Sequence, residues 1–344
     1  MQVFRGFNHP GIAPATALTI GNFDGVHRGH QAMLALLKSE ASHRGLPATV
    51  LTFEPHPRDY FSQVLQRPEL APRRIATLRD KLGELQRCGI DQVVVLRFDA
   101  ALAALSPQGF IEQVLNQGLG ARYVLVGDDF RFGAKRLGDY ATLDAAGQRD
   151  GFDVARMMSY EVHGLRVSSS AVREALASGD MARTERLLGR PYAISGRVVH
   201  GLKLGRELSA SRPGAGDGFR TLNLRFTHPK PAAQGIFVVR TWGLGEAPLD
   251  GVASLGSRPT VDDSGRVLLE VHCLEWPQTL QAQLGPKEAY GKLVRVELLH
   301  KLRDEAHFDS LSALTQAIAC DVAQARAWLA AHAAVRRQTT RDRI

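Results

Sequence analysis

The hydrophobic pattern of this 344-residue chain changes once, near residues 187–192, and this change constrains the fold most strongly. In the first half, short apolar runs alternate with amphipathic stretches. Residues His30–His43 have the spacing of a helix, and the apolar runs predict strands at Ala17–Ile20, Ala48–Phe53, Gln92–Phe98 and Tyr123–Val126. Strands that alternate with helices are typical of a doubly wound parallel sheet. We therefore expect an α/β domain of Rossmann-like architecture over residues 1–187.

In the second half, many short β-type runs are separated by turns that contain Gly and Pro. These runs lie at Ala193–Val199, Gly235–Val239, Leu268–His272 and Leu293–Leu299. Short strands in close succession predict a small antiparallel β-barrel. An amphipathic stretch at about Ser310–Ala330 predicts a last helix that Ser310 caps and that packs on the barrel. The expected second domain covers residues 188–335, and a basic tail follows at 336–344.

The charge balance predicts anionic partners. The net charge is +8 and the isoelectric point is near 9.7, which favours nucleotides, phosphates, nucleic acid or acidic lipid without choosing among them. The sequence holds no basic stripe with interleaved aromatic residues, so we expect small-molecule partners rather than nucleic acid or a membrane. We expect the chain to be a monomer or a weak homo-oligomer.

The sequence also predicts the cellular compartment of this chain. No stretch approaches the ~18 consecutive apolar residues that a membrane span needs, and the first residues lack the pattern of an export signal. The three cysteines, Cys88, Cys273 and Cys320, are far apart and match neither a disulfide framework nor a metal-site spacing. We expect reduced structural thiols and a cytoplasmic location.

The most informative segment is Gly-Asn-Phe-Asp-Gly-Val-His-Arg-Gly-His at residues 21–30, directly between a predicted strand and a helix. His27 and His30, three residues apart at a helix start, share one face near the positive end of the helix dipole. Glycines at 21, 25 and 29 let phosphate oxygens approach free backbone N–H groups. Such donors stabilise charge on an α-phosphate and on departing pyrophosphate. The segment therefore predicts nucleotidyl transfer.

Residues 27–30 resemble the His-x-Gly-His signature of the nucleotidyltransferase superfamily, and the longer string resembles its FAD synthetase branch. The resemblance implies that His27 and His30 are catalytic and that ATP binds on the loop before them, FMN being adenylylated to FAD. No base is needed for this step, because the phosphate of FMN is already anionic. The ATP-binding residues implied in this loop are Gly21, Asn22, Phe23, Asp24 and Gly25.

Three further segments resemble the same branch. Phe-Glu-Pro-His-Pro at 53–57 holds His56, and Gly-Asp-Asp-Phe-Arg-Phe-Gly at 127–133 holds Asp129 and Arg131; the resemblance implies flavin contacts for both. Taken alone, the first of these segments is a weak signal. Val-Ser-Ser-Ser-Ala-Val-Arg at 167–173 places serines at a helix start, where side chains and amides can bind phosphate oxygens. The implied ligands of the ATP triphosphate are Ser169, Ser170 and Arg173.

From about Ser195 onward the chain resembles riboflavin kinase. The resemblance is carried by residues 196–206, 251–260, 269–272, 290–291 and 302–303. It implies a nucleotide loop with Gly196, Gly201, Lys203 and Gly205, and a flavin contact at Arg303. An alcohol that attacks ATP must lose its proton, so a carboxylate base is required, and the resemblance implies Glu270. It also implies that Thr221 and Asn223 hold Mg²⁺, the cofactor expected for both reactions.

The chain departs from that family between Leu208 and Asn223. The usual run Gly-Phe-Pro-Thr-Ala-Asn is replaced by an extra stretch, about Ser209–Asp217, followed by Phe-Arg-Thr-Leu-Asn at 219–223. The missing proline removes a backbone constraint and Leu222 is bulkier than alanine, so we expect a differently shaped nucleotide loop. A second longer stretch lies at about Pro277–Pro286. Adenylylation alone, with an impaired kinase domain, is therefore an alternative.

Two other classes of protein share some of these features. Another adenylyltransferase or an aminoacyl-tRNA synthetase would share His-x-Gly-His, but the sequence has no Lys-Met-Ser-Lys-Ser-like loop and a riboflavin-kinase-like half would not be expected in either. A nucleic-acid-binding protein built on a decayed enzyme would show strong, salt-dependent binding without flavin turnover.

Overall fold

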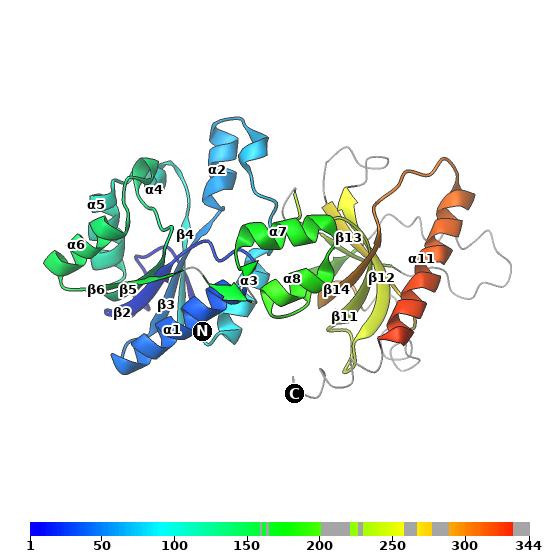
Figure 1. Ribbon diagram of the computed structural model, residues 1–344, viewed down its shortest axis with the longest axis horizontal. Helices are drawn as coiled ribbons and strands as arrows, with labels where there is room; N and C mark the ends of the chain where they lie inside the picture. The colour runs from blue at the N-terminus through cyan, green and yellow to red at the C-terminus, as the bar shows by residue number, and fades with distance from the viewer. Residues whose placement is uncertain are drawn as a thin grey trace. The chain divides into compact units, whose positions relative to one another are not determined.

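The computed structural model describes residues 1–158, 160–162, 165–200, 221–225, 230–257, 267–276 and 289–332 (Figure 1). The contacts within the chain divide it into two units, Met1–Ala171 and Val172–Ile344. The boundary expected between residues 187 and 188 and the extent of the basic tail stay predictions.

The first unit is built on a six-stranded sheet in the order β1-β4-β3-β2-β5-β6, in which every neighbouring pair is parallel. The central strands are buried on both faces, which is why they read as continuous apolar runs. The expected doubly wound parallel sheet is confirmed. Its strands are β1 Gln2–Arg5, β2 Thr16–Ile20, β3 Ala48–Glu54, β4 Gln92–Arg97, β5 Ala121–Gly127 and β6 Asp153–Met157.

Helices cover both faces of this sheet (Figure 1). One face packs against α1 and α3, through Leu34, Leu37 and Leu85, and the other packs against η2 and α6, through Ile111 and Leu143. A short two-stranded ribbon, β7 Glu161–Val162 and β8 Leu165–Arg166, follows β6. The helices of this unit are α1 Arg28–His43, α2 Pro57–Val64, η1 Pro68–Leu70, α3 Leu78–Arg87, α4 Ala100–Ala104, α5 Pro107–Gly109, η2 Phe110–Gly118, η3 Ala134–Arg136 and α6 Tyr140–Asp150.

The strand order reverses direction at β2. From β2 the chain proceeds through β3 to β4 on one side, and then returns to β5 and β6 on the other side. In open α/β sheets, ligands bind outside the carboxyl ends of the strands at such a switch point. The segments that follow β2 and β5 both begin there, so the expected nucleotide loop at residues 21–30 lies at this position.

The second unit contains a closed antiparallel barrel in the order β10-β13-β12-β11-β14-β9, which β9 and β10 close. Along β13 buried and half-buried residues alternate, so Leu269 and Val271 face the interior while Glu270 and His272 face outward. The expected barrel is confirmed. Its strands are β9 Tyr192–Val199, β10 Thr221–Arg225, β11 Gly235–Trp242, β12 Leu249–Ser257, β13 Val267–Cys273 and β14 Leu293–Arg303.

Among the described residues, helices α7, α8 and α11 complete the fold. The last helix, α11 Leu311–Ala331, packs on the outside of β11 and β12, where Ala325 meets Val238 and Val252. Its cap is the expected one, because the hydroxyl of Ser310 accepts a hydrogen bond from the backbone N–H of Ala313 at 3.1 Å. The other two helices are α7 Ser169–Ser178 and α8 Met181–Leu188. Among the residues that the model describes, no helix combines the length and apolar character needed to cross a membrane.

Candidate active sites

The two histidines of the nucleotide loop lie against each other at the start of α1. Their rings are stacked at a centroid distance of 3.6 Å with an angle of 15° between planes. The centroid of the buried Phe23 ring lies 4.9 Å from that of His30, with an angle of 54° between the planes. The expected position of His27 and His30 on one face is confirmed, and the ring of His30 contacts both neighbouring rings.

A hydrogen bond also determines which nitrogen of His27 carries a proton. His27 is the N-cap of α1, and its Nδ1 accepts a hydrogen bond from the backbone N–H of His30 at 3.3 Å. A nitrogen that accepts cannot hold a proton, so the neutral ring carries its proton on Nε2. Nε2–H is therefore the N–H group of this neutral ring. The capping role and the donor role therefore use different atoms of one side chain.

Asp24 attaches the loop before these histidines to the segment at residues 75–76. Its buried carboxylate accepts hydrogen bonds from the backbone N–H groups of Ile75 and Ala76, at 3.2 and 3.1 Å. Gly25 has φ +84°, and a Cβ placed there would lie 2.7 Å from the side chain of Ile75. The Asp24 carboxylate is thus engaged inside the protein, which leaves the backbone of this loop as the part that can meet ATP.

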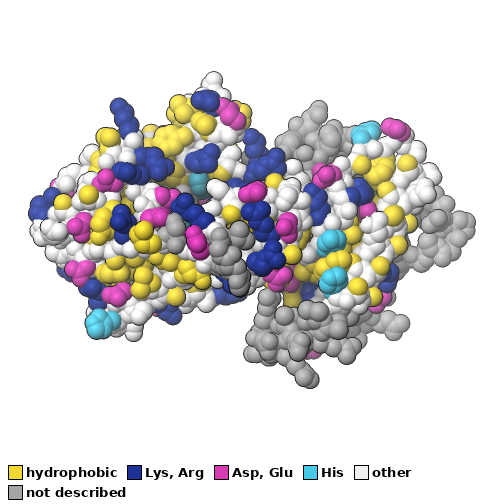
Figure 2. Space-filling model, in the orientation of Figure 1, with side chains coloured by type: hydrophobic (Ala, Val, Ile, Leu, Met, Phe, Trp, Pro, Cys, Tyr) yellow, Lys and Arg dark blue, Asp and Glu magenta, His cyan; other side chains and the backbone are white. Residues whose placement is uncertain are grey.

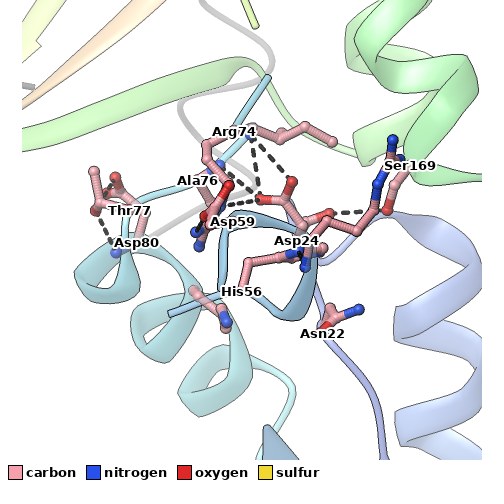
Figure 3. Close-up of polar contacts among 12 residues, drawn as sticks. Asn22, Asp24, His56, Asp59, Arg74, Ala76, Thr77, Asp80 and Ser169 are labelled. Carbon is pink, nitrogen blue, oxygen red and sulfur yellow. Dashed lines mark hydrogen bonds and ion pairs between the residues drawn. The ribbon is translucent and has the colours of Figure 1, made fainter. Parts of the chain in front are cut away.

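Two further predicted ATP ligands lie beside this loop. The buried amide oxygen of Asn22 has no hydrogen-bond partner among the described residues, so it can accept from a ligand. The hydroxyl of Ser169, at the start of α7, donates to the backbone carbonyl of Asp24 at 3.3 Å (Figure 3). Ser170 is exposed, and Arg173 follows Ser169 by one turn on the same helix. The structure therefore brings the serine segment to the nucleotide loop.

His56 occupies an equivalent place after the neighbouring strand β3. It is buried and caps α2, its Nδ1 accepting from the backbone N–H of Arg58 at 3.1 Å, so its neutral ring also carries the proton on Nε2. Exposed hydrophobic side chains gather over α2 (Figure 2), among them Phe61, Val64 and Leu65. His56 thus lies at the start of the helix along which these apolar side chains are exposed.

The second predicted flavin segment follows β5. Arg131 pairs with Asp139 at 3.0 Å, and both side chains are exposed. Hydrogen bonds from Thr142, together with Arg131, lower the pKa of Asp139, which also caps α6. Asp129 lies two residues after Gly127, the end of β5. The predicted flavin residues of this segment are thus found at the switch point of the sheet, with Arg131 already bound to a carboxylate.

A buried charge cluster beneath these loops was not predicted from the sequence. Arg74 is 2% exposed and lies within ion-pair distance of three carboxylates, those of Asp24 at 3.9 Å, Glu54 at 3.4 Å and Asp59 at 2.8 Å. Burial alone would lower the pKa of Arg74, but the three carboxylates raise it. Burial raises the pKa of Asp59 despite the opposing effect of Arg74. Figure 3 shows Arg74 reaching across to Asp24 and Asp59.

In the barrel, strand register brings the predicted kinase residues together. Asn223 of β10 pairs with Glu270 of β13, which pairs in turn with Ser254 of β12. Residues directly opposite in antiparallel strands project from the same face, so these three side chains form one row on the outside of the barrel. Thr221 pairs with His272 on the same face. The predicted base and the predicted metal ligands are therefore neighbours.

The remaining predicted kinase residues have different surroundings. Arg303, at the end of β14, donates from Nε and Nη2 to the carboxylate of the buried Asp321 of α11, at 2.9 and 2.7 Å. Gly196 lies on β9, where an added Cβ would come within 3.2 Å of Leu224. The three other nucleotide-loop predictions, Gly201, Lys203 and Gly205, lie outside the described residues.

Comparisons with known proteins match both halves. A family model described as FAD synthetase matches residues 10–171, and one described as riboflavin kinase matches residues 188–329. The bifunctional riboflavin kinase/FMN adenylyltransferase of Escherichia coli strain K12 is 44% identical over 328 residues, which are 95% of this chain and 97% of the relative. The chain belongs to the bifunctional riboflavin kinase/FMN adenylyltransferase family. Its member from Pseudomonas fluorescens is 42% identical over 333 residues, 95% of this chain and 97% of that protein.

A solved structure has the same arrangement of elements within its chain. The crystal structure titled macrolide-efflux protein from Streptococcus pneumoniae is similar with a TM-score of 0.70 and 24% identity, over 95% of this chain and 99% of that chain. At this identity the likeness shows the fold alone. The family assignment therefore rests on the family models and the curated relatives.

Proposed function

We propose that this chain phosphorylates riboflavin to FMN and adenylylates FMN to FAD, with ATP as the donor in both steps. One observation carries the proposal: each unit holds its own group of reactive side chains, the stacked His27 and His30 in the first and the row that contains Asn223 and Glu270 in the second. We assign the adenylyl transfer to residues 1–187 and the kinase to residues 188–335.

In the first unit, the attacking group is a phosphate oxygen of FMN and the leaving group is pyrophosphate. The Nε2–H of His27 donates to a phosphate oxygen of ATP, and His30 stabilises the charge that develops on the same group. Backbone N–H groups of residues 21–25 and the start of α7, with Ser169, Ser170 and Arg173, bind the remaining phosphate oxygens. His56, Asp129 and Arg131 contact FMN. These contacts position the two substrates and neutralise the charge on their phosphates, and no base takes part.

In the second unit, the terminal hydroxyl of riboflavin attacks the γ-phosphate of ATP, and ADP leaves as the bond between the γ-phosphorus and the bridging oxygen breaks. Glu270 accepts the proton of this hydroxyl as the bond to phosphorus forms. Gly196 and the following loop residues Gly201, Lys203 and Gly205 bind the nucleotide, and Arg303 contacts the flavin. Glu270 is half-buried and lies on the outer face of the barrel, so its carboxylate can meet a substrate there.

Asn223 and Thr221 suit a magnesium ion bound with ATP. The buried amide oxygen of Asn223 has no hydrogen-bond partner among the described residues, and Thr221 lies on the same outer face. Mg²⁺ prefers oxygen ligands and is usually held by few protein groups together with substrate phosphates. In both reactions the ion would neutralise charge on the phosphates. Among the described residues, no group of three His, Cys, Asp or Glu side chains forms a metal site.

The alternative of FMN adenylylation alone is less well supported. It depends on the altered stretch before Thr221, and residues 201–220 lie outside the described part of the chain. The riboflavin kinase model spans the whole second half, and the relatives named above carry both activities in their names. Because both steps consume ATP, we propose that the protein works in the cytoplasm with small-molecule substrates, as a monomer or weak homo-oligomer.

The test is to incubate the purified protein with ATP and magnesium plus either riboflavin or FMN, and to separate the flavins chromatographically. FAD formed from both substrates is the expected result. FAD formed from FMN but not from riboflavin would show that the kinase domain is inactive. No turnover of either flavin, with steeply salt-dependent binding of RNA or DNA, would favour the nucleic-acid-binding alternative.

A further inference from the structure

The segment that contains Arg74 connects three parts of the first unit. Asp24 belongs to the nucleotide loop, three residues before His27, and Glu54 ends β3, two residues before His56. Asp59 lies in the first turn of α2. Arg74 pairs with all three carboxylates, so one guanidinium joins the loop of His27 and His30 to the loop of His56.

The cluster is largely buried, so its side chains have little freedom to change their positions. The side chains of Arg74 and Asp24 are each 2% exposed, and those of Glu54 and Asp59 are 25% and 19% exposed. A planar guanidinium presents five donors in a fixed fork, so its position determines where several carboxylates lie. Buried ion pairs are weak evidence for stability, since apolar replacements are often neutral or stabilising. The arrangement is better suited to holding two loops at a set distance.

A second buried cation supports the same loops. Lys81 of α3 is 1% exposed, and its ammonium donates to the hydroxyl of Thr52 in β3 at 3.3 Å. That hydroxyl donates in turn to the backbone carbonyl of Asn22 at 3.4 Å. The nucleotide loop is therefore attached to the interior at Asn22 through Lys81 and at Asp24 through Arg74.

We propose that Arg74 is a positioning residue for adenylyl transfer, which sets the distance between the Nε2–H donors of His27 and His56. This inference rests on the proposed function of the first unit. If both histidines donate to the reacting phosphates, a shift of one loop against the other misaligns them in the transition state. Misplacement by about 1 Å can cost on the order of a hundredfold in rate. Arg74 itself touches neither substrate.

The decisive variant is Arg74→Lys, which keeps the charge but replaces the fork by a single ammonium. We expect kcat for FAD formation from FMN to fall by about tenfold to a hundredfold, with a smaller change in the KM for ATP. FMN formation from riboflavin should not change, because the second unit performs it. The matched control is Arg67→Lys, since Arg67 lies on the same connection but pairs with Glu69 in an exposed position.

A double-mutant cycle separates positioning from simple stability. If Arg74 acts through the His56 loop, Arg74→Lys should cost much less kcat in a His56→Ala background than alone. A purely structural role would lower the melting temperature and leave kcat of the folded protein unchanged well below that temperature. Should Arg74→Lys not fold, Asp59→Asn serves instead, because it removes the negative charge from the 2.8 Å ion pair and keeps the other two carboxylates.

The outcomes are distinct. A lower kcat for FAD formation that is non-additive with His56→Ala supports the inference. An unchanged kcat in Arg74→Lys or, where that variant does not fold, in Asp59→Asn overturns it, and so do strictly additive effects. A wild-type protein that forms no FAD from FMN overturns the proposed function first, and the inference with it.

Discussion

The buried side chain of Lys81 should make the free energy of unfolding depend on pH, in a direction and by an amount that follow from its pKa. Burial of its ammonium, helped by the neighbouring positive charge of Arg74, lowers the pKa of Lys81 from 10.5 to about 8. Each pH unit of difference corresponds to 1.36 kcal/mol. The folded state therefore bears a cost of up to about 3 kcal/mol for a charged Lys81 at neutral pH.

The direction of the change in unfolding free energy with pH follows from the number of protons that each state binds. Between pH about 8 and 10.5 the unfolded chain keeps the proton on this lysine while the folded protein has lost it. The free energy of unfolding should rise with pH in this window, because the unfolded state binds more protons. Compared with Lys81→Met, the wild-type protein should gain up to about 3 kcal/mol from pH 7.5 to pH 10.5. Other titrating groups cancel in this difference.

The assay must report on the first unit. All three tryptophans, Trp242, Trp276 and Trp328, lie in the second unit, so tryptophan fluorescence follows that unit. Urea unfolding recorded by far-UV circular dichroism gives the remaining transition, which belongs to the first unit. Lys38→Met is the control, because Lys38 is an exposed residue of α1. A difference between wild type and Lys81→Met that stays constant from pH 7.5 to 10.5 would refute the reasoning.

Three further substitutions test the two sites. His30→Ala should abolish FAD formation and leave FMN formation intact in a flavin-separation assay; loss of both activities in a folded variant contradicts two independent sites. Glu270→Gln should do the reverse, and unchanged riboflavin phosphorylation would remove Glu270 from the mechanism. Leu222→Ala should destabilise the barrel by about 2–5 kcal/mol through the cavity it leaves, measured by urea unfolding with tryptophan fluorescence. A loss below 1 kcal/mol would contradict its place in the barrel core.

Strong local patterns explain the elements that could be predicted. The buried strands β2, β3, β4 and β5 are rich in apolar residues, and each was predicted to within two residues of its ends. The edge strands β1 and β6 were not predicted. They are partly exposed and short, at four and five residues, so neither carries an apolar run or a clear alternation. Sheet position therefore decided which strands the sequence could reveal.

The same distinction holds within the candidate sites. His27 and His30 are three residues apart at a helix start, so their closeness could be predicted from the local sequence. Arg74 is different, since its partners Asp59 and Glu54 lie 15 and 20 residues away and on separate elements. Nothing in its neighbours distinguishes it from an exposed arginine. Only the packing of α2, β3 and the nucleotide loop around one position makes it a buried cation.

The alternation of side chains along β10 shows where the leucine at 222, which replaces the alanine usual in riboflavin kinases, has its effect. Leu222 is 3% exposed and pairs with Val271, so its extra bulk compared with alanine enters the barrel core. Asn223 projects to the opposite, outer face, where it meets Glu270. A larger residue at 222 therefore alters core packing and leaves the outer row in register. Thr221, Asn223 and Glu270 therefore stay on one face of the barrel, as the kinase site proposed above needs.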